Sequence, residues 1–91
     1  MIITKVNVRK AFDKDPLRAI VSITLDGELA VHDIKVIHAA GKHFIVMPSR
    51  KLADGTFCDV AHPIKSEFRS QIESAVLGAY FAEIEEKEER Q

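Results

Sequence analysis

Apolar and polar residues alternate with a period of two in the first third of the chain, and this alternation constrains the fold more than any other feature. It runs through residues 2–9 and 17–25, and a third run covers residues 28–37. Side chains two positions apart lie on the same face of a β-strand, so the pattern predicts strands with one buried face. Asp26 and Gly27 separate the second run from the third. Because glycine accepts the positive φ that a type I′ turn requires, this pair predicts a tight antiparallel hairpin.

The third run changes parity partway along. Leu29 and Val31 are odd-numbered, whereas Ile34 and Val36 are even-numbered. One extra residue in a strand moves every later side chain to the other face of the sheet. We therefore predict a β-bulge or a sharp bend at residues 32–33.

The rest of the chain predicts two short strands and one helix. Residues 44–47 form a strand that ends at Pro48, and residues 56–61 form the last strand. From Ser66 onward, one helix face collects the apolar residues Phe68, Ile72, Ala75, Val76, Ala79 and Tyr80. A second apolar stripe consists of Leu77, Phe81 and Ile84. The two stripes are wider than one side of a small sheet needs, so we expect a partner chain, joined through this second stripe or through pairing of unpaired strand edges.

These elements predict an α+β fold, with an antiparallel β-sheet of about five strands and a C-terminal α-helix packed on it, assembled as a dimer. Ninety-one residues suffice for one domain. We expect this domain to span residues 1–82 and residues 83–91 to form an acidic helix end or tail. The tail holds five acids and two bases, a charge of −3, so the net charge of −1 leaves +2 for residues 1–82. A mildly basic body favours an anionic partner.

The chain carries no signal for a membrane. No apolar run approaches the roughly 18 residues of a membrane-spanning helix, and the N-terminus lacks the apolar core of a signal peptide. The single cysteine, Cys58, cannot form an internal disulfide, which fits a reducing compartment. We therefore expect a cytoplasmic protein with no membrane partner.

Two adjacent cations, Arg50 and Lys51, lie in a predicted loop over residues 49–55, just after Pro48. Arginine binds phosphate as a two-pronged donor and lysine as a point charge, and the Ser49 hydroxyl is a neutral donor beside them. A solvated turn is the alternative interpretation, since paired bases are common in loops. Further bases that would widen a patch are Arg9, Lys10, Lys14, Arg18, Lys35, Lys42, Lys65 and Arg69.

Other chemistry has weaker support. A zinc set can be assembled from His38, His43, Cys58 and His62, with gaps of four residues between the first two and three between the last two, but structural zinc sites usually show tighter pairs such as Cys-x2-Cys. The adjacent His32 and Asp33 would face opposite sides of a regular strand. Cys58 and His62 lack a third group to orient them. We expect no metal, no cofactor, no small-molecule substrate and no enzymatic activity.

Four segments occur in order and without large gaps: RAIVSITLD at residues 18–26, VHDIKVI at 31–37, MPSRK at 47–51 and DGTFCDVAHPI at 54–64. Together they resemble the SpoVG family (stage V sporulation protein G, often labelled septation protein). The resemblance covers about residues 1–80. It implies a dimeric, bacterial, cytoplasmic regulator that binds DNA and, in some members, RNA, and it implies a link to sporulation, septum formation and gene expression.

The family's basic pair after Met-Pro-Ser falls on Arg50 and Lys51, which strengthens the expectation of phosphate contacts there. We expect the nucleic-acid site to contain Ser49, Arg50, Lys51, Lys42 and Arg9. Cys58 stands where members commonly carry a basic residue, so one cation is missing near the loop.

The alternative function is a protein-interaction module in cell division with no direct nucleic-acid contact. The position of the cations discriminates between the two. A shared face for Arg50 and Lys51 with Lys42 or Arg9 favours nucleic acid. Neutralisation of the pair by acids such as Asp54 favours the interaction module.

Overall fold

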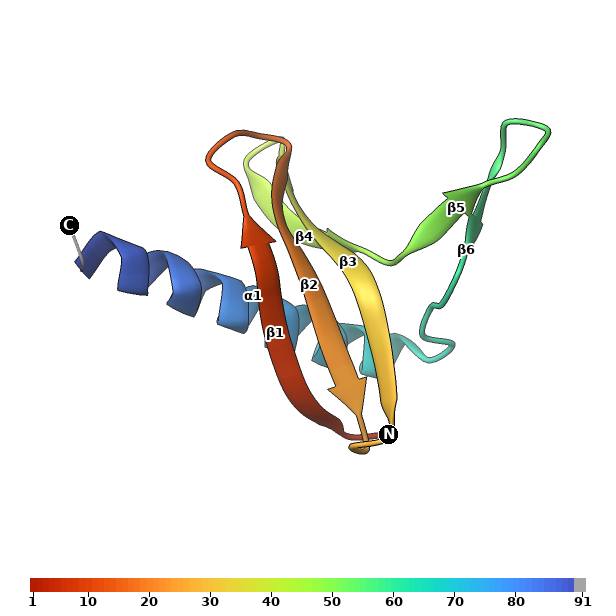
Figure 1. Ribbon diagram of the computed structural model, residues 1–91, viewed down its shortest axis with the longest axis horizontal. Coiled ribbons are helices and arrows are strands. Elements are labelled where there is room, and N and C mark those ends of the chain that lie inside the picture. The colour runs from red at the N-terminus through yellow and green to blue at the C-terminus, as the bar shows by residue number, and fades with distance from the viewer. Residues whose placement is uncertain (90–91) are drawn as a thin grey trace.

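The computed structural model describes residues 1–89, with side chains through residue 85. Four antiparallel strands form the main sheet in the order β1-β2-β3-β4, and a separate sheet pairs β5 with β6 (Figure 1). The strands are β1 (Ile3–Ala11), β2 (Leu17–Leu25), β3 (Leu29–Ala39), β4 (Lys42–Val46), β5 (Ser49–Lys51) and β6 (Phe57–Asp59). One helix, α1 (Ser66–Glu89), follows them. The predicted α+β class is confirmed, and the strands divide between two sheets.

The turn between β2 and β3 has the predicted hairpin geometry. Asp26 and Gly27 have φ values of 52° and 67°, and the Glu28 N–H donates to the Leu25 carbonyl at 2.9 Å. Both central residues therefore adopt the positive φ of a type I′ turn. The β3–β4 turn repeats this geometry at residues 40–41, where φ is 53° and 76°.

The predicted bulge in β3 is confirmed at residues 32–33. Val21 of β2 pairs with Ile34, whereas Ile23 pairs with Val31, so Ser22 faces two residues of β3. One of these two residues, Asp33, has a φ of 65°. The extra residue explains why the buried positions of β3 change from odd to even numbers.

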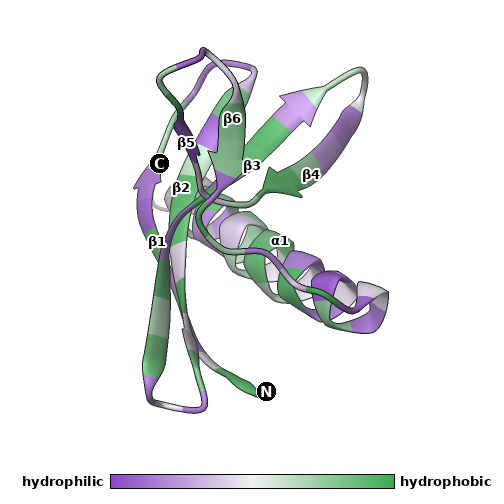
Figure 2. Cartoon of the chain, turned by 90° about the vertical axis from the view of Figure 1, so that its right-hand side faces the viewer, coloured by the Kyte–Doolittle hydropathy of each residue, from purple (hydrophilic) through white to green (hydrophobic). Residues whose placement is uncertain are grey.

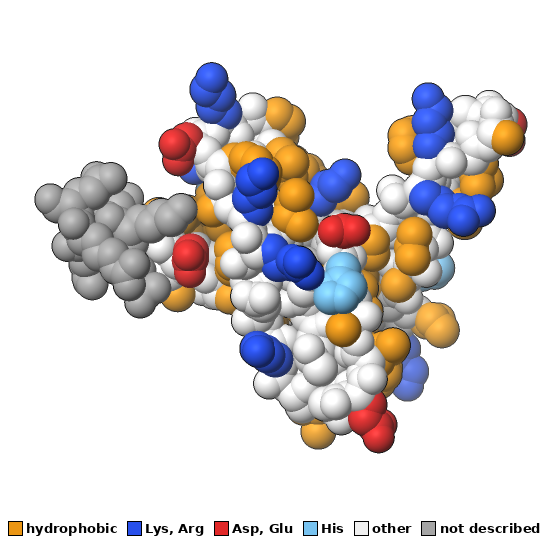
Figure 3. Space-filling model, in the orientation of Figure 1, with side chains coloured by type: hydrophobic (Ala, Val, Ile, Leu, Met, Phe, Trp, Pro, Cys, Tyr) orange, Lys and Arg blue, Asp and Glu red, His pale blue; other side chains and the backbone are white. Residues whose placement is uncertain are grey.

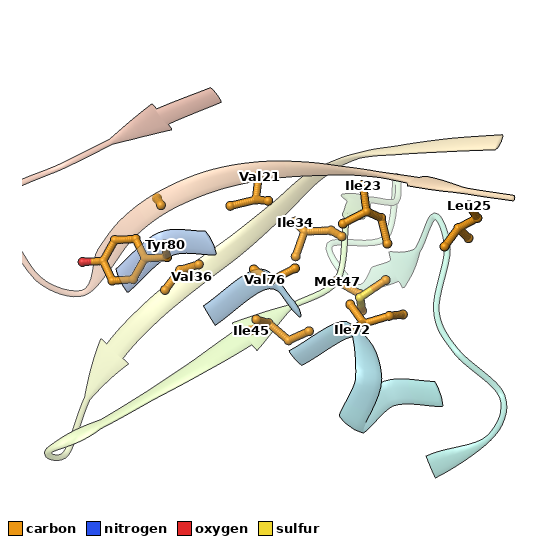
Figure 4. Packing of buried hydrophobic residues seen from close by; sticks show 11 residues of the cluster. Val21, Ile23, Leu25, Ile34, Val36, Ile45, Met47, Ile72, Val76 and Tyr80 are labelled. Atoms are coloured by element: carbon orange, nitrogen blue, oxygen red, sulfur yellow. The ribbon is translucent and has the colours of Figure 1, made fainter. Parts of the chain in front are cut away.

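Helix α1 covers one face of the four-stranded sheet (Figure 2). Ile72, Val76 and Tyr80, spaced four residues apart, are almost completely buried. They pack against Met47, which follows β4, and against strand residues of the core, which are Ala19, Val21, Ile23, Leu25, Ile34, Val36 and Ile45 (Figure 4). The predicted apolar face of the helix is therefore the face that meets the sheet. No helix among residues 1–89 is long and apolar enough to cross a membrane.

The second stripe of the helix contributes in part to the same core. Leu77 and Ile84 are half-buried and pack against the core cluster, whereas Phe81 remains 41% exposed. Some of the apolar width that predicted a partner chain is therefore covered by the chain's own sheet. The dimer through Leu77, Phe81 and Ile84 stays a prediction.

Strands β5 and β6 form a hairpin that projects away from the main sheet (Figure 1), and we call this hairpin the arm. The predicted basic loop over residues 49–55 is wrong at its start, because residues 49–51 form strand β5. The connection from Leu52 to Thr56 closes the hairpin, with the Leu52 N–H donating to the Thr56 carbonyl at 2.7 Å. A polar strand of three residues leaves no periodic apolar pattern, so the sequence did not reveal it.

Candidate nucleic-acid interface

The sheet face that points away from α1 is basic. The four strands of the main sheet contain six cations and a single acid, Asp33. Residues directly opposite each other on paired strands share a face. This register assigns four of the cations to the outer face, and the contact of Arg9 with His32 places a fifth there. These five are Lys5, Arg9, Lys10, Lys35 and Lys42. Figure 3 views this face and shows Lys and Arg side chains spread across it.

Pairing fixes how these cations are arranged. Lys10 of β1 and Lys35 of β3 both pair with Ile20 of β2, so they flank it in one row across the sheet. Arg9 occupies the second of two irregularities in β1, between Val8 and Lys10, and its guanidinium lies 3.5 Å from His32 Nδ1. Lys42 lies at the start of β4, opposite Ala39 and on the same face.

The sixth cation, Arg18, points toward the helix. Its Nε donates to the Tyr80 hydroxyl at 3.0 Å, and one terminal nitrogen donates to the Asp13 carbonyl at 2.9 Å. The bond to Tyr80 raises the pKa of the Arg18 guanidinium above its ordinary value, with Asp15 and Asp13 acting in the same direction. Arg18 therefore links the β1–β2 connection to the helix and does not belong to the candidate interface.

The arm carries Arg50 and Lys51, the two cations that were predicted to lie in a loop and to bind phosphate. Arg50 and Lys51 are exposed, and successive strand residues alternate sides, so the two side chains leave the arm in opposite directions. Asp54 does not neutralise them. Its carboxylate accepts from the Thr56 hydroxyl at 2.6 Å and the Thr56 N–H at 3.0 Å, which lowers the pKa of Asp54. Within residues 1–85, neither Arg50 nor Lys51 forms an ion pair.

The predicted site residues thus fall in two places. Arg9 and Lys42 share the outer sheet face, whereas Arg50 and Lys51 lie on the arm. Ser49, at the base of the arm, lines a groove that runs between the arm and β3. Figure 3 shows the arm separated from the body by a notch, with basic side chains on both.

Sequence reasoning placed no special weight on Lys5, Lys10 or Lys35. The strand register brings all three onto the same face as Arg9. Their alternation with inward-facing residues indicated that they face outward. However, the irregularities in β1 and β2 mean that counting every second residue does not assign the faces correctly.

The histidines and the cysteine make other contacts. His38 and His43 stack with ring centroids 4.3 Å apart, and His38 Nδ1 lies 3.0 Å from the Asp15 carboxylate. His62 pairs with Asp59 at 3.7 Å. Among the residues that the structure describes, no group of three or more His, Cys, Asp or Glu side chains is arranged to hold a metal ion.

This architecture defines a class of small α+β proteins that present cations on an open sheet face and on a projecting hairpin. The chain belongs to the SpoVG family, whose family model matches residues 1–82. It is 51% identical to a protein of Acetivibrio thermocellus over 80 residues, which cover 88% of this chain and 85% of the relative. A Clostridium kluyveri protein is 52% identical over 80 residues, covering 88% and 83%. A Clostridium beijerinckii protein is 48% identical over 87 residues, covering 96% of each.

All three relatives carry the name "Putative septation protein SpoVG". The resemblance seen in the four sequence segments is confirmed. The family is not a known enzyme family, and its name is consistent with a role in sporulation or septation.

Proposed function

We propose that this protein is a bacterial regulator that binds the phosphate backbone of DNA or RNA through its outer sheet face and its arm, and thereby influences gene expression, sporulation or septum formation. The observation that carries the proposal is the distribution of charge in the main sheet. Five cations share the face opposite the helix, and Asp33 is the one acid in those four strands. Phosphate contacts from lysine and arginine supply most of the sequence-independent affinity of nucleic-acid-binding proteins.

The exposed cations of the arm extend this basic surface. Because Arg50 and Lys51 form no ion pair within residues 1–85, no internal partner must be displaced before a phosphate binds. Each phosphate that is neutralised contributes about −0.9 to the slope of log K against log salt on duplex DNA. A surface with a handful of cations therefore gives modest affinity that weakens strongly with salt.

A homodimer is part of the proposal. A small domain buries a limited fraction of its surface, and self-association covers the remaining apolar groups. Here Phe81 is 41% exposed on the helix, and Phe57 is 72% exposed on the arm. Two copies would present two basic surfaces to one nucleic acid, which raises the overall affinity above that of a single surface.

Fluorescence anisotropy with labelled duplex DNA and single-stranded RNA tests the proposal. Wild-type protein is compared at low and physiological salt with two double variants, Arg50→Ala/Lys51→Ala on the arm and Lys10→Ala/Lys35→Ala on the sheet. We expect both variants to bind more weakly and with a smaller salt slope. Lys65→Ala is the matched control, because Lys65 lies at the opposite groove beside the helix start. Its affinity should stay within about twofold of wild type, as expected for a cation that makes no phosphate contact.

A second candidate is an interaction module for a protein of cell division. An apolar groove lined by Met1, Leu29, Ile64 and Phe68 favours it, since Ile64 is 96% exposed and Met1 64% exposed. Large exposed apolar side chains mark interaction surfaces. Absence of nucleic-acid binding at low salt by correctly folded wild-type protein would reject the first function and leave this one.

A further inference from the structure

A groove separates the arm from β3. Its cavity volume is about 540 Å³, and it runs along β3 from Leu29 to Lys35. Ile20 and Val31 contribute apolar surface from the sheet, and Val60 contributes it from the segment that follows the arm. We call it the arm groove. Its apolar walls suit a flat ring better than they suit a hydrated phosphate group.

The polar groups in the arm groove come from the bulge and from the base of the arm. His32, Asp33 and Ser49 line it, and Lys35 lies at its end. Within residues 1–85, the Asp33 carboxylate forms neither a hydrogen bond nor an ion pair, so its oxygens are free to accept. The groove therefore combines one free carboxylate, one aromatic ring and apolar walls, with cations at its margins.

This combination disfavours a phosphate next to Asp33. A carboxylate repels phosphate, and the cations that would bind phosphate lie on the surrounding sheet face and arm. A carboxylate does accept hydrogen bonds from the amino groups of bases. Unpaired bases are read on their edges by such groups while their faces stack on rings such as histidine.

We propose that the arm groove takes one unpaired nucleobase, with an amino-bearing edge against Asp33 and the neighbouring phosphates on Lys35 and Arg9. The proposal rests on the proposed function and deepens it. It makes single-stranded nucleic acid the preferred partner over duplex, because base pairing occupies the Watson–Crick edge that carries guanine N1–H. It also predicts that guanine binds best, since its N1–H and amino group are two adjacent donors that match the two oxygens of a carboxylate.

The test uses nine-residue oligonucleotides of uridine with one central base, which is guanine, adenine, cytosine or uracil. Deoxythymidine versions of the same series separate DNA from RNA, and a duplex of equal length provides the comparison for strandedness. We expect the guanine-containing strand to bind about tenfold more tightly than all-uridine, the scale of one good two-pronged base contact. The duplex should bind more weakly than the guanine-containing strand.

Asp33→Asn is the decisive variant. Asparagine tolerates the positive φ of 65° at this position, so the bulge is retained while one acceptor becomes a donor. Asp26→Asn is the matched control. Asp26 also has a positive φ, of 52°, and lies in the β2–β3 turn, and its replacement removes the same charge. We expect Asp33→Asn to lose discrimination among the four bases and Asp26→Asn to keep it.

The outcomes distinguish base binding in the arm groove from phosphate binding by the sheet face and the arm. If all four oligonucleotides bind equally, and binding is still weakened by salt and by Arg50→Ala/Lys51→Ala, the arm groove does not bind a base. The proposed function would remain intact. Duplex binding as tight as single-strand binding would lead to the same conclusion. Equal loss of discrimination in Asp33→Asn and Asp26→Asn would remove Asp33 as the reader of the base. No binding to any probe would overturn both proposals.

Discussion

The hydroxyl of Ser22 on β2 lies 2.8 Å from Nδ1 of His32 on β3, directly across the bulge. Ser22 is only 7% exposed, although it lies on the outer side of the sheet. The guanidinium of Arg9 approaches the same nitrogen at 3.5 Å and can only donate. Nδ1 is therefore assigned as the acceptor, and the proton of neutral His32 as residing on Nε2. This contact ties the bulge to β2 and fixes the backbone that carries Asp33.

The bulge requires the left-handed backbone conformation at position 33. Asp33→Val should lower the free energy of unfolding by about 1–2 kcal/mol, because a β-branched side chain is strained at positive φ. Asp33→Gly should be at least as stable as Asp33→Asn, since glycine adopts this conformation without strain. Urea denaturation followed by circular dichroism measures all three. Equal midpoints for the Val and Gly variants would show that the bulge is not confined to this conformation.

The bond between Arg18 and Tyr80 joins the β1–β2 end of the sheet to the helix. Tyr80→Phe keeps the buried ring and removes the acceptor of the 3.0 Å bond. We expect a loss of about 1 kcal/mol or somewhat more, because the lost bond involves a charged and partly exposed guanidinium. A double-mutant cycle with Arg18→Met isolates the pair. Additive effects of the two substitutions would contradict a direct coupling.

The free energy of unfolding should decrease as the pH falls below neutral, in part because of His43. Burial lowers the pKa of His43 below its ordinary 6.5, and the facing His38 and Arg18 lower it further, against an opposing effect of Asp15. The unfolded chain therefore binds a proton more readily than the folded one, so the stabilisation is present above pH 6.5 and is lost as the pH falls toward and through the folded pKa. His43→Phe keeps a ring at this position and cannot be protonated.

Urea unfolding of wild type and His43→Phe between pH 7.5 and 5.0 measures this effect. The difference in unfolding free energy between the two proteins should change in favour of the variant as the pH falls. Contributions from titratable groups that do not interact with His43 cancel in that difference. A constant difference across the range would show that His43 is not the responsible group.

Phe81 is the side chain on which the predicted helix interface can be tested with least damage to the fold. It is 41% exposed, whereas Leu77 is partly buried in the core cluster. If the helix stripe joins two chains, Phe81→Ser should reduce the mass measured by sedimentation velocity from two chains to one at unchanged helix content. Ile64→Ser is the comparison, since Ile64 is the most exposed large apolar residue described. A dimer that survives Phe81→Ser but not Ile64→Ser would place the interface at the apolar groove instead.

Local pattern alone predicted much of the fold. The Asp26-Gly27 turn, the change of parity around His32 and the apolar face ending at Tyr80 each depend only on nearby residues, and each is present in the structure. Spacing of two or of 3.6 residues directly reflects which side of a strand or helix is buried. The four segments likewise predicted the SpoVG family, which the family model confirms.

The candidate site required the tertiary structure. Arg9 and Arg18 are both basic residues in alternating runs, yet Arg9 lies on the outer face and Arg18 bonds to the helix. A register shift between Leu17 and Ala19 accompanies this difference, and no local count of residues predicts it. The arm and its groove also depend on pairing between residues 49–51 and residues 57–59. The sequence by itself determined the apolar faces of β2 and α1, because in these elements the burial pattern is local. Only the packed sheet decided which charges meet, because register and bulges set the positions of side chains far apart in the chain.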